Sequence, residues 1–420
     1  MKKFLLLAAT VVMALSVSAA DKTTVKANVA GTAVKTTSIM QKTARGMKID
    51  AETMQKLSVL RAAKMNAAKA PVVSDLYGSY VEDSYDEANE LTECSSVEVS
   101  GCDEAVELED GTILPLNIYF EGMCGGDCNV MGNYNAETGL IVIPAGMTCN
   151  DLDEYGEIWI AGIDAVNEGY LCDLELIVGD DGYITLNEEV CNGWYIGMTG
   201  DYSNYYWGRG NSLDLGKANG TINFREKHVE NGAWTAWAVV EDKVFIEDLG
   251  DILFIHNFLQ KGVCQVELDV ENMTIAIPNM QPMMYGGTNA GVMFLTGCSI
   301  DEEGYLNPEY ENYDFTTEGE LYPSAIAFGT IDQTEGQWDE PNYYYICSNV
   351  DEEGYGYYAG FYTTIEASLD EGVFQAFQTD AIKTVNGAEN SAVSYNVLGQ
   401  KVAKDAKGLV INNGKKYMNK

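Results

Sequence analysis

The chain offers few residues that could carry acid–base or metal chemistry. Its 420 residues contain two histidines, His228 and His256, so a histidine-based triad or metal site would have to use one of them. His256 lies in the strand-like segment LFIHNF, where we expect it to face a neighbouring strand or the edge of a core. No nucleophile elbow, HExxH, Walker or dinucleotide-binding motif occurs in the context that its chemistry requires.

Carboxylates, in contrast, are abundant. Residues 72–380 hold 59 Asp and Glu against six Lys and Arg, a net charge of −53. Two of these acids could serve glycoside hydrolysis, but so many candidates single out no pair. Acidic turns at 180–181, 301–303 and 351–353 offer hard oxygen ligands for Ca²⁺, although none has the spacing of a calcium loop. We expect no enzyme activity and no cofactor, with Ca²⁺ at such turns as the alternative.

Aromatic side chains form the densest group of candidate ligand-binding residues. They occur in WYIGMTGDYSNYYWGRG, residues 194–210, and in YGYYAGFY, residues 355–362. Exposed Tyr and Trp rings can stack on sugar rings, and an arginine beside them can donate hydrogen bonds. The alternative is that tyrosine is simply a good strand former. The candidate site residues are Trp194, Tyr202, Tyr205, Tyr206, Trp207 and Arg209.

These residues lie in a region whose sequence pattern indicates antiparallel β structure. Short runs such as GLIVIP, EIWIAGI, LELIV and TIAIP are rich in β-branched and aromatic residues. Polar–glycine pairs such as Asp110–Gly111 and Asn219–Gly220 separate the runs and suit tight turns. We therefore predict an all-β fold built from antiparallel β-sandwiches or β-barrels.

An internal repeat divides this β region into two modules. YNAETGLIVIPAGM (134–147) aligns with LDVENMTIAIPNMQ (268–281), so that Ile141 falls on Ile275. At the same offset GEIWIAGI aligns with AGVMFLTG, and after an insertion of one residue NEGYL aligns with EEGYL. Upstream, LNIYF aligns more weakly with FIHNF, and GSYV with GAWT. We predict tandem modules at 72–226 and 227–378.

The N-terminal region has two parts. Residues 1–20 combine two lysines, an apolar run and small residues before Asp21, the pattern of a cleaved signal peptide. The apolar run is shorter than the about 20 residues that a transmembrane helix needs. Residues 21–71 are a basic leader with a net charge of +7, and strong helix formers after Asp50 predict a helix over about 51–69.

All ten cysteines lie between residues 94 and 347. An exported chain can form disulfides, and we expect some bridges here. Cys124-Gly125-Gly126-Asp127-Cys128 predicts a local pair, because a glycine turn can bring its ends together.

Residues 379–420 form a basic tail. Tyr-Asn-Val-Leu-Gly-Gln-Lys-Val begins at Tyr395, and Lys407-Gly408-Leu409-Val410-Ile411 and Gly414-Lys415-Lys416 follow it. These segments resemble the short C-terminal sorting domain of type IX secretion cargo over the last 30–40 residues. The matching positions are Tyr395, Gly399, Gln400, Val402, Gly408, Gly414, Lys415 and Lys416. The two strand-like runs, SYNVLGQKV and GLVINNGKK, and the turn between them predict a small β-hairpin. The resemblance implies recognition by the secretion machinery and release or anchoring at the outer cell surface; it implies no activity.

Taken together, the sequence predicts a secreted or surface-displayed protein. Its acidic centre repels nucleic acid, and no segment is long and apolar enough to span a membrane. Adhesion or ligand binding is the expected role, with a glycan as the favoured ligand and a surface protein as another partner. The alternatives are a structural cell-surface component and a carboxylate-dependent glycoside hydrolase.

Overall fold

The computed structural model describes residues 71–378, apart from short gaps, and the backbone of four strands between residues 394 and 419. The gaps are 87–90, 109–110, 127, 153–155, 168–169, 180–181, 204–205, 231–232, 287–290, 301–305, 311, 329–343 and 348–356. The predicted signal peptide and the basic leader with its helix lie outside the described residues. Within them the chain is almost all β, with helical turns at η1 (Val73–Leu76), η2 (Gly200–Tyr202) and residues 375–378. The predicted all-β class is confirmed.

Eight strands of the first half close into an antiparallel barrel. Around the barrel they are β1 (Gly78–Asp86), β2 (Leu91–Ser100), β5 (Ile118–Met123), β6 (Cys128–Asn135), β7 (Leu140–Ile143), β11 (Leu174–Val178), β12 (Ile184–Leu186) and β15 (Asp214–Lys217). Each strand pairs with the next, and β15 pairs back with β1, where Lys217 lies opposite Tyr80. A closed barrel has no unpaired sheet edge to recruit other chains.

Eight strands of the second half close in the same way. They are β16 (Gly220–Lys227), β19 (Ala238–Asp248), β20 (Ile252–Phe258), β21 (Gly262–Asp269), β22 (Thr274–Pro278), β26 (Thr316–Tyr322), β27 (Ala325–Phe328) and β29 (Tyr358–Leu369). The last strand, β29, pairs with the first, β16, where Leu369 lies opposite Gly220. The molecule is therefore a tandem of closed barrels.

The strands of the two barrels correspond one to one in chain order, as the internal repeat predicts. The aligned residues Ile141 and Ile275 lie in β7 and β22, the fifth strand of each barrel, and both are buried. LNIYF and FIHNF overlap β5 and β20, the third strand of each barrel. Burial alternates along β7 and along β22, so the same register faces each core.

Strand pairing moves the boundary between the modules. β16, which the sequence places mostly in the first module, pairs with β19 and β29 and belongs to the second barrel. The boundary therefore falls at Ala218–Asn219 rather than at 226/227. The alignment of GSYV with GAWT is wrong, because β1 corresponds to β16 in the strand order. Trp234 of GAWT instead lies in a separate two-stranded hairpin.

Each barrel carries a side sheet inserted between its barrel strands. The first side sheet consists of β8 (Met147–Leu152), β9 (Gly156–Asp164), β10 (Leu171–Cys172), β13 (Cys191–Met198) and β14 (Tyr206–Gly210). Its counterpart contains β23 (Gln281–Tyr285), β24 (Val292–Ile300), β25 (Leu306–Pro308) and β28 (Tyr344–Cys347). Two short hairpins are β3 (Glu104–Glu107) with β4 (Ile113–Leu116), and β17 (Val229–Glu230) with β18 (Ala233–Trp234).

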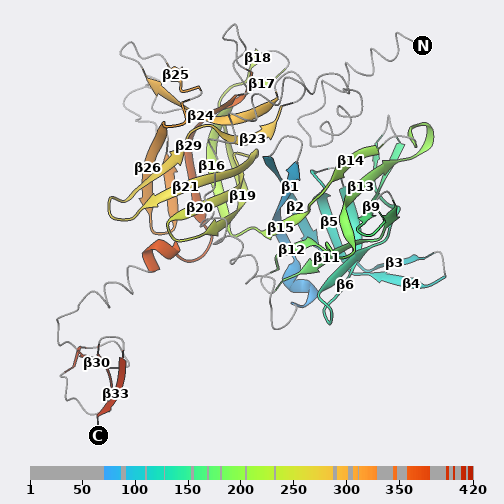
Figure 1. Cartoon of the computed structure of the whole chain (residues 1–420), viewed down its shortest axis with the longest axis horizontal. Coiled ribbons are helices and arrows are strands. Elements are labelled where there is room, and N and C mark those ends of the chain that lie inside the picture. The colour runs from blue at the N-terminus through green and yellow to red at the C-terminus, as the bar shows by residue number, and fades with distance from the viewer. Residues whose placement is uncertain are drawn as a thin grey trace.

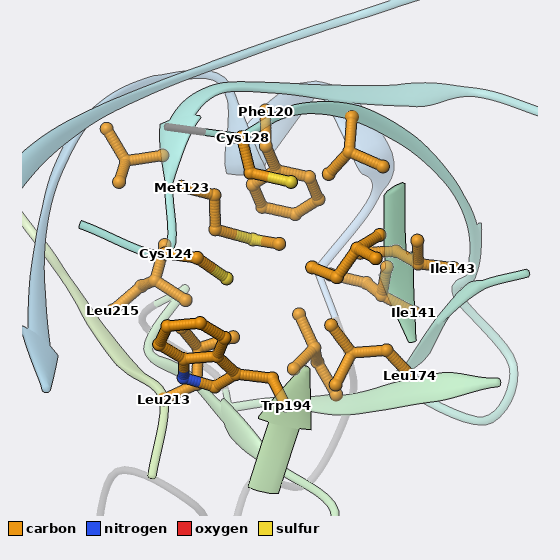
Figure 2. Packing of buried hydrophobic residues seen from close by; sticks show 14 of the residues in the cluster. Phe120, Met123, Cys124, Cys128, Ile141, Ile143, Leu174, Trp194, Leu213 and Leu215 are labelled. Carbon is orange, nitrogen blue, oxygen red and sulfur yellow. The ribbon is translucent and has the colours of Figure 1, made fainter. Parts of the chain in front are cut away.

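The first side sheet shares a core with the first barrel. Figure 2 shows Phe120, Met123, Ile141 and Leu174 from the barrel pointing toward a common interior that Trp194 of β13 enters from the side sheet. Burial of such side chains is the main favourable term in folding, at about 1.5–3 kcal/mol for each large apolar group. The second barrel has a separate core, in which Phe258 stacks on Phe328.

The cysteine pairing differs from the prediction. Cys128 of β6 is linked to Cys149 of β8, with 4.7 Å between their Cα atoms, and the buried Cys124 takes no part in this disulfide. Cys124 starts the glycine turn in the left-handed region, at φ 57°, and its backbone N–H donates to Glu82. The predicted Cys124–Cys128 bridge is therefore wrong, and the observed disulfide ties the first side sheet to its barrel.

The barrels lie side by side, with β1 and β2 of the first against β19, β20 and β21 of the second (Figure 1). Glu93 of β2 pairs with Gly262 of β21, and its carboxylate accepts the backbone N–H of Tyr285 at 2.8 Å. Val81, Tyr183 and Phe245 form a small apolar cluster at this contact. No helix of the described residues is long and apolar enough to cross a membrane.

The described part of the tail is a four-stranded antiparallel sheet. Its strands are β30 (Ser394–Asn396), β31 (Lys401–Val402), β32 (Gly408–Asn412) and β33 (Lys415–Asn419). The tail is thus larger than the predicted hairpin, because residues 415–419 turn back and pair with β32. Tyr395, Val402, Gly408, Lys415 and Lys416 fall on these strands; Gly399, Gln400 and Gly414 lie outside the described residues.

Candidate functional site

The outer face of the first side sheet is the surface on which the predicted binding residues can be tested. Successive side chains of a strand point to opposite faces. On β13, Trp194, Ile196 and Met198 face the core of the first barrel, so Tyr195 and Gly197 between them face outward. The predicted aromatic segment therefore divides between the core and the surface.

Three aromatic rings from three strands lie together on this outer face. Trp159 of β9 has its ring centroid 5.7 Å from that of Tyr195, and Tyr195 lies 6.0 Å from Tyr206 of β14. All three side chains are half-buried. We call Trp159, Tyr195 and Tyr206 the aromatic platform. Tilted neighbouring rings are a favoured arrangement, because the positive edge of one ring meets the negative face of the next.

A glycine sets the height of the platform. Gly197 lies opposite both Trp159 on β9 and Tyr206 on β14. A Cβ at this position would come within 2.1 Å of the Trp159 ring, so the indole rests directly on the backbone of β13. Any side chain at residue 197 would push the indole away and break the surface formed by the three rings.

Polar groups border the platform. Arg209 is exposed and lies opposite Tyr195 in the β13–β14 register, and exposed Thr148 of β8 lies opposite Trp159. Burial raises the pKa of Tyr195, and the neighbouring Tyr206 raises it further. The Tyr195 phenol therefore stays protonated at neutral pH. The face combines stacking surface with a hydroxyl, a phenol and a guanidinium.

The predicted residues do not all reach this face. Trp194 is 6% exposed, and its Nε1 donates to the carbonyl of Ser212 at 3.0 Å, so the core holds its ring. Trp207 is half-buried against the same core. The strand register shifts between Ile196 and Gly197, which skips Trp207 and turns it inward. The structure thus brings together Tyr206 and Arg209.

The two remaining predicted residues cannot be placed on the face. Tyr205 lies outside the described residues, and so does the side chain of Tyr202 in η2. In the second aromatic segment Tyr362 is fully buried in the core of the second barrel. Tyr362 is therefore a core residue, as the alternative interpretation allows, whereas Tyr357 of the same segment is exposed.

Sequence reasoning missed two members of the platform. Tyr195 could have been found from alternation, because Trp194, Ile196 and Met198 form one apolar set around it. Trp159 lies 35 residues before Trp194, and no local pattern links them. Only the pairing of β9 with β13, which depends on the whole side sheet, brings Trp159 beside Tyr195.

A second group of chemically active side chains lies between the barrels. His256 is 2% exposed; its Nε2 is 2.9 Å from Glu247 Oε2, and its Nδ1 is 2.6 Å from Asp83 Oδ2. The thiol of Cys94 donates to Asp83 Oδ1 at 3.1 Å. We call Asp83, Cys94, Glu247 and His256 the interbarrel cluster.

Strand alternation explains this cluster. Tyr80 and Glu82 of β1 are buried, with Tyr80 in the core of the first barrel, and the alternate residues Val81 and Asp83 point to the second barrel. On β20, Leu253 and Ile255 face the second core, so His256 points out. Burial by itself lowers the pKa of His256, but the two carboxylates outweigh it and raise that pKa to about 9. The cluster carries an imidazolium between two carboxylates at neutral pH.

The other expected chemistry falls elsewhere. His228 is 40% exposed and lies 3.6 Å from Glu226, away from the interbarrel cluster. The three acidic turns expected to suit Ca²⁺, at 180–181, 301–303 and 351–353, lie outside the described residues.

No protein-family model matches this sequence, and a search of curated proteins found no match either.

Proposed function

We propose that this protein is exported to the cell surface, where it binds a glycan on the aromatic platform of its first side sheet. The observation that carries the proposal is the grouping of Trp159, Tyr195 and Tyr206 on one face, with exposed Arg209 beside them. Sugar rings present apolar faces ringed by hydroxyls. Aromatic rings pack against such faces, and the surrounding polar groups satisfy the hydroxyls.

Rigid support favours this surface over the other aromatic groups of the described chain. The three rings stand on paired strands whose opposite side packs into the core of the first barrel. The Cys128–Cys149 disulfide also fixes β8 of the same sheet to the barrel. A preformed surface loses little conformational entropy on binding, which raises affinity for a given contact area.

Surface display rests on the chain ends. Residues 1–20 have the pattern of a cleaved export signal, and residues 395–416 resemble a sorting tail. An adhesin displayed in this way would use the acidic barrels as a soluble, non-aggregating support. The closed barrels serve the same end, because a closed sheet leaves no strand edge for other chains to join.

Affinity measurements on matched variants test the platform. The mature chain, residues 21–420, and its variants would be titrated with the glycan that binds best in an array. Trp159→Ala and Tyr206→Ala should each weaken binding at least about tenfold, equivalent to about 1.4 kcal/mol. Tyr170→Ala removes an exposed ring away from the platform and should leave the affinity unchanged. Equal affinities for all three variants would refute this binding face.

A further inference from the structure

The interbarrel cluster brings three different metal-ligand types to one point. Asp83, Cys94 and His256 offer a carboxylate oxygen, a sulfur and an imidazole nitrogen, all within 4.8 Å of one another. They come from β1, β2 and β20, so both barrels contribute. Asp83 and Cys94 are directly opposite in the β1–β2 register, which fixes their separation through paired backbone.

The ring nitrogen that faces this point lacks a well-aligned partner. Among the described residues no group makes an aligned hydrogen bond to Nδ1 of His256, although Asp83 Oδ2 is only 2.6 Å away. A buried polar atom without an aligned hydrogen bond calls for an explanation, such as an ion. Nδ1 is also the nitrogen that points toward Asp83 and Cys94.

The other ring nitrogen of His256, Nε2, has a carboxylate partner, as is usual for a metal-binding histidine. His256 Nε2 lies 2.9 Å from Glu247 Oε2, and the Glu247 side chain is fully buried. A metal-ligating histidine commonly donates its second N–H to a carboxylate, which fixes the tautomer and the ring plane. Glu247 is therefore a positioning residue, while Asp83, Cys94 and His256 face the ion.

The surroundings favour binding of a partly dehydrated ion. Phe245 packs 5.2 Å from the His256 ring, and Val81 and Tyr183 complete an apolar wall beside Cys94. An apolar shell strengthens metal–ligand electrostatics by excluding water. Asp83 and Cys94 remain partly exposed, which leaves an entry path for the ion and an open coordination position.

Charge and geometry select the ion. Sulfur and imidazole ligands suit zinc, whereas Ca²⁺ and Mg²⁺ prefer oxygen alone. Zinc lies about 2.0–2.2 Å from nitrogen and oxygen ligands, so two ligands at a tetrahedral angle are roughly 3.3–3.5 Å apart. Nδ1 and Oδ2 would have to separate by less than about 1 Å.

We infer that Asp83, Cys94 and His256 bind one zinc ion between the two barrels, with Glu247 orienting the histidine. The fourth position is open to water. The site is independent of the aromatic platform, which lies on the side sheet, so failure of either proposal leaves the other untouched. Zinc would therefore link the two barrels, because Asp83 and Cys94 belong to the first barrel and His256 to the second.

Metal stoichiometry of the full mature chain tests the site. The protein would be stripped with a chelator, loaded with zinc, desalted and measured by elemental mass spectrometry. We expect one zinc per chain, and loss of that ion in Cys94→Ser and in His256→Gln. Glu247→Gln should weaken zinc binding about 10–100-fold, the usual effect of removing an outer-shell partner. Cys102→Ser and His228→Gln, matched changes outside the cluster, should retain the ion.

Two measurements on the unmutated chain keep the test decisive if a variant fails to fold. Loading with Co²⁺ should give a thiolate-to-cobalt absorption band, and zinc should protect Cys94 from alkylation, read peptide by peptide. Zinc that binds without protecting Cys94 would overturn the proposal. So would a desalted chain without zinc, or a folded Cys94→Ser and His256→Gln pair that both retain it.

Discussion

One buried acid, Glu82, determines the local backbone geometry of a turn in the first barrel. Glu82 of β1 is 1% exposed, and its carboxylate accepts the backbone N–H groups of Cys124 at 2.6 Å and Gly125 at 3.1 Å. These contacts hold a turn that starts with a non-glycine residue in the left-handed region. Because β1 and the turn are 42 residues apart, one side chain links distant parts of the barrel.

Replacing this acid should cost stability. Glu82→Gln keeps the size of the side chain but removes the charge from the acceptor of two backbone N–H groups, one buried and one partly buried. We expect a loss of about 1.5–3 kcal/mol in the free energy of unfolding, the usual range for hydrogen bonds to charged groups. Urea unfolding of both proteins measures it. Glu188→Gln, which changes an exposed acid, is the control; an equal, small effect of both changes would contradict the role of Glu82.

Residue roles could be predicted only where a local pattern decides them. The apolar alternation of β13 marks Trp194 as a core residue, and the density of aromatics led to Tyr206 and Arg209 but not to Trp159. The cysteine pairing depended on a long-range contact. A spacing of four residues favours Cys124 with Cys128, yet β8 places Cys149 against Cys128 from 21 residues away.

At the scale of elements, a short sequence repeat corresponds to a complete strand order. GLIVIP and TIAIP have the same alternation because both lie fifth in a closed barrel with one face toward a core. Ile141 and Ile275 are both fully buried or nearly so. The equivalence predicts that the two positions have the same structural role.

Truncation at either equivalent position should therefore destabilise its own barrel. Ile141→Ala and Ile275→Ala should each lower the free energy of unfolding by about 2–5 kcal/mol, since each leaves a cavity in a packed core. Val239→Ala, which changes an exposed strand residue, should stay within about 0.5 kcal/mol. Chemical denaturation followed by circular dichroism measures all three. A small effect at only one of the isoleucines would show that the positions are not equivalent.

The sequence therefore carried the fold class and the tandem arrangement, but not the closure of the sheets. Alternation and turns define strands locally, whereas closure depends on pairs such as Lys217 with Tyr80 and Leu369 with Gly220. The boundary was misplaced for the same reason. β16 follows β15 after two residues, and only its pairing with β29 assigns it to the second barrel.

At the scale of the whole molecule, charge acts over both barrels. The acidic region of residues 72–380 has a net charge of −53, although its barrels contact one another through β1, β2, β19 and β20. Like charges at this density repel and destabilise the compact state. Added salt shortens the range of that repulsion, from about 30 Å at 0.01 M to about 8 Å at 0.15 M.

Thermal stability should consequently depend on salt. The melting temperature of the chain from residue 21 to residue 420 is expected to rise between about 0.01 M and 0.15 M NaCl, because screening weakens repulsion between exposed acids more than it weakens buried ion pairs such as His256–Glu247. Scanning calorimetry at both salt concentrations measures the shift. Identical melting temperatures would mean that the acids are spaced or paired so that their repulsion is negligible.

The tail should govern the last step of export. Deleting residues 394–420 removes β30 to β33 and the sorting-like positions Lys415 and Lys416. In a host with type IX secretion, we expect the truncated protein to remain in the periplasm while the full chain reaches the surface. Fractionation and surface labelling distinguish the two locations. Surface display without the tail would remove its proposed role.

Binding of a glycan to the aromatic platform is best tested with a glycan array. The mature chain and its Trp159→Ala variant would be applied in parallel after circular dichroism shows both to be folded. We expect a reproducible group of bound glycans for the unmutated chain and loss of that signal for the variant. Absence of any bound glycan for the folded unmutated chain, or the same set of bound glycans for both proteins, would contradict glycan binding by the platform.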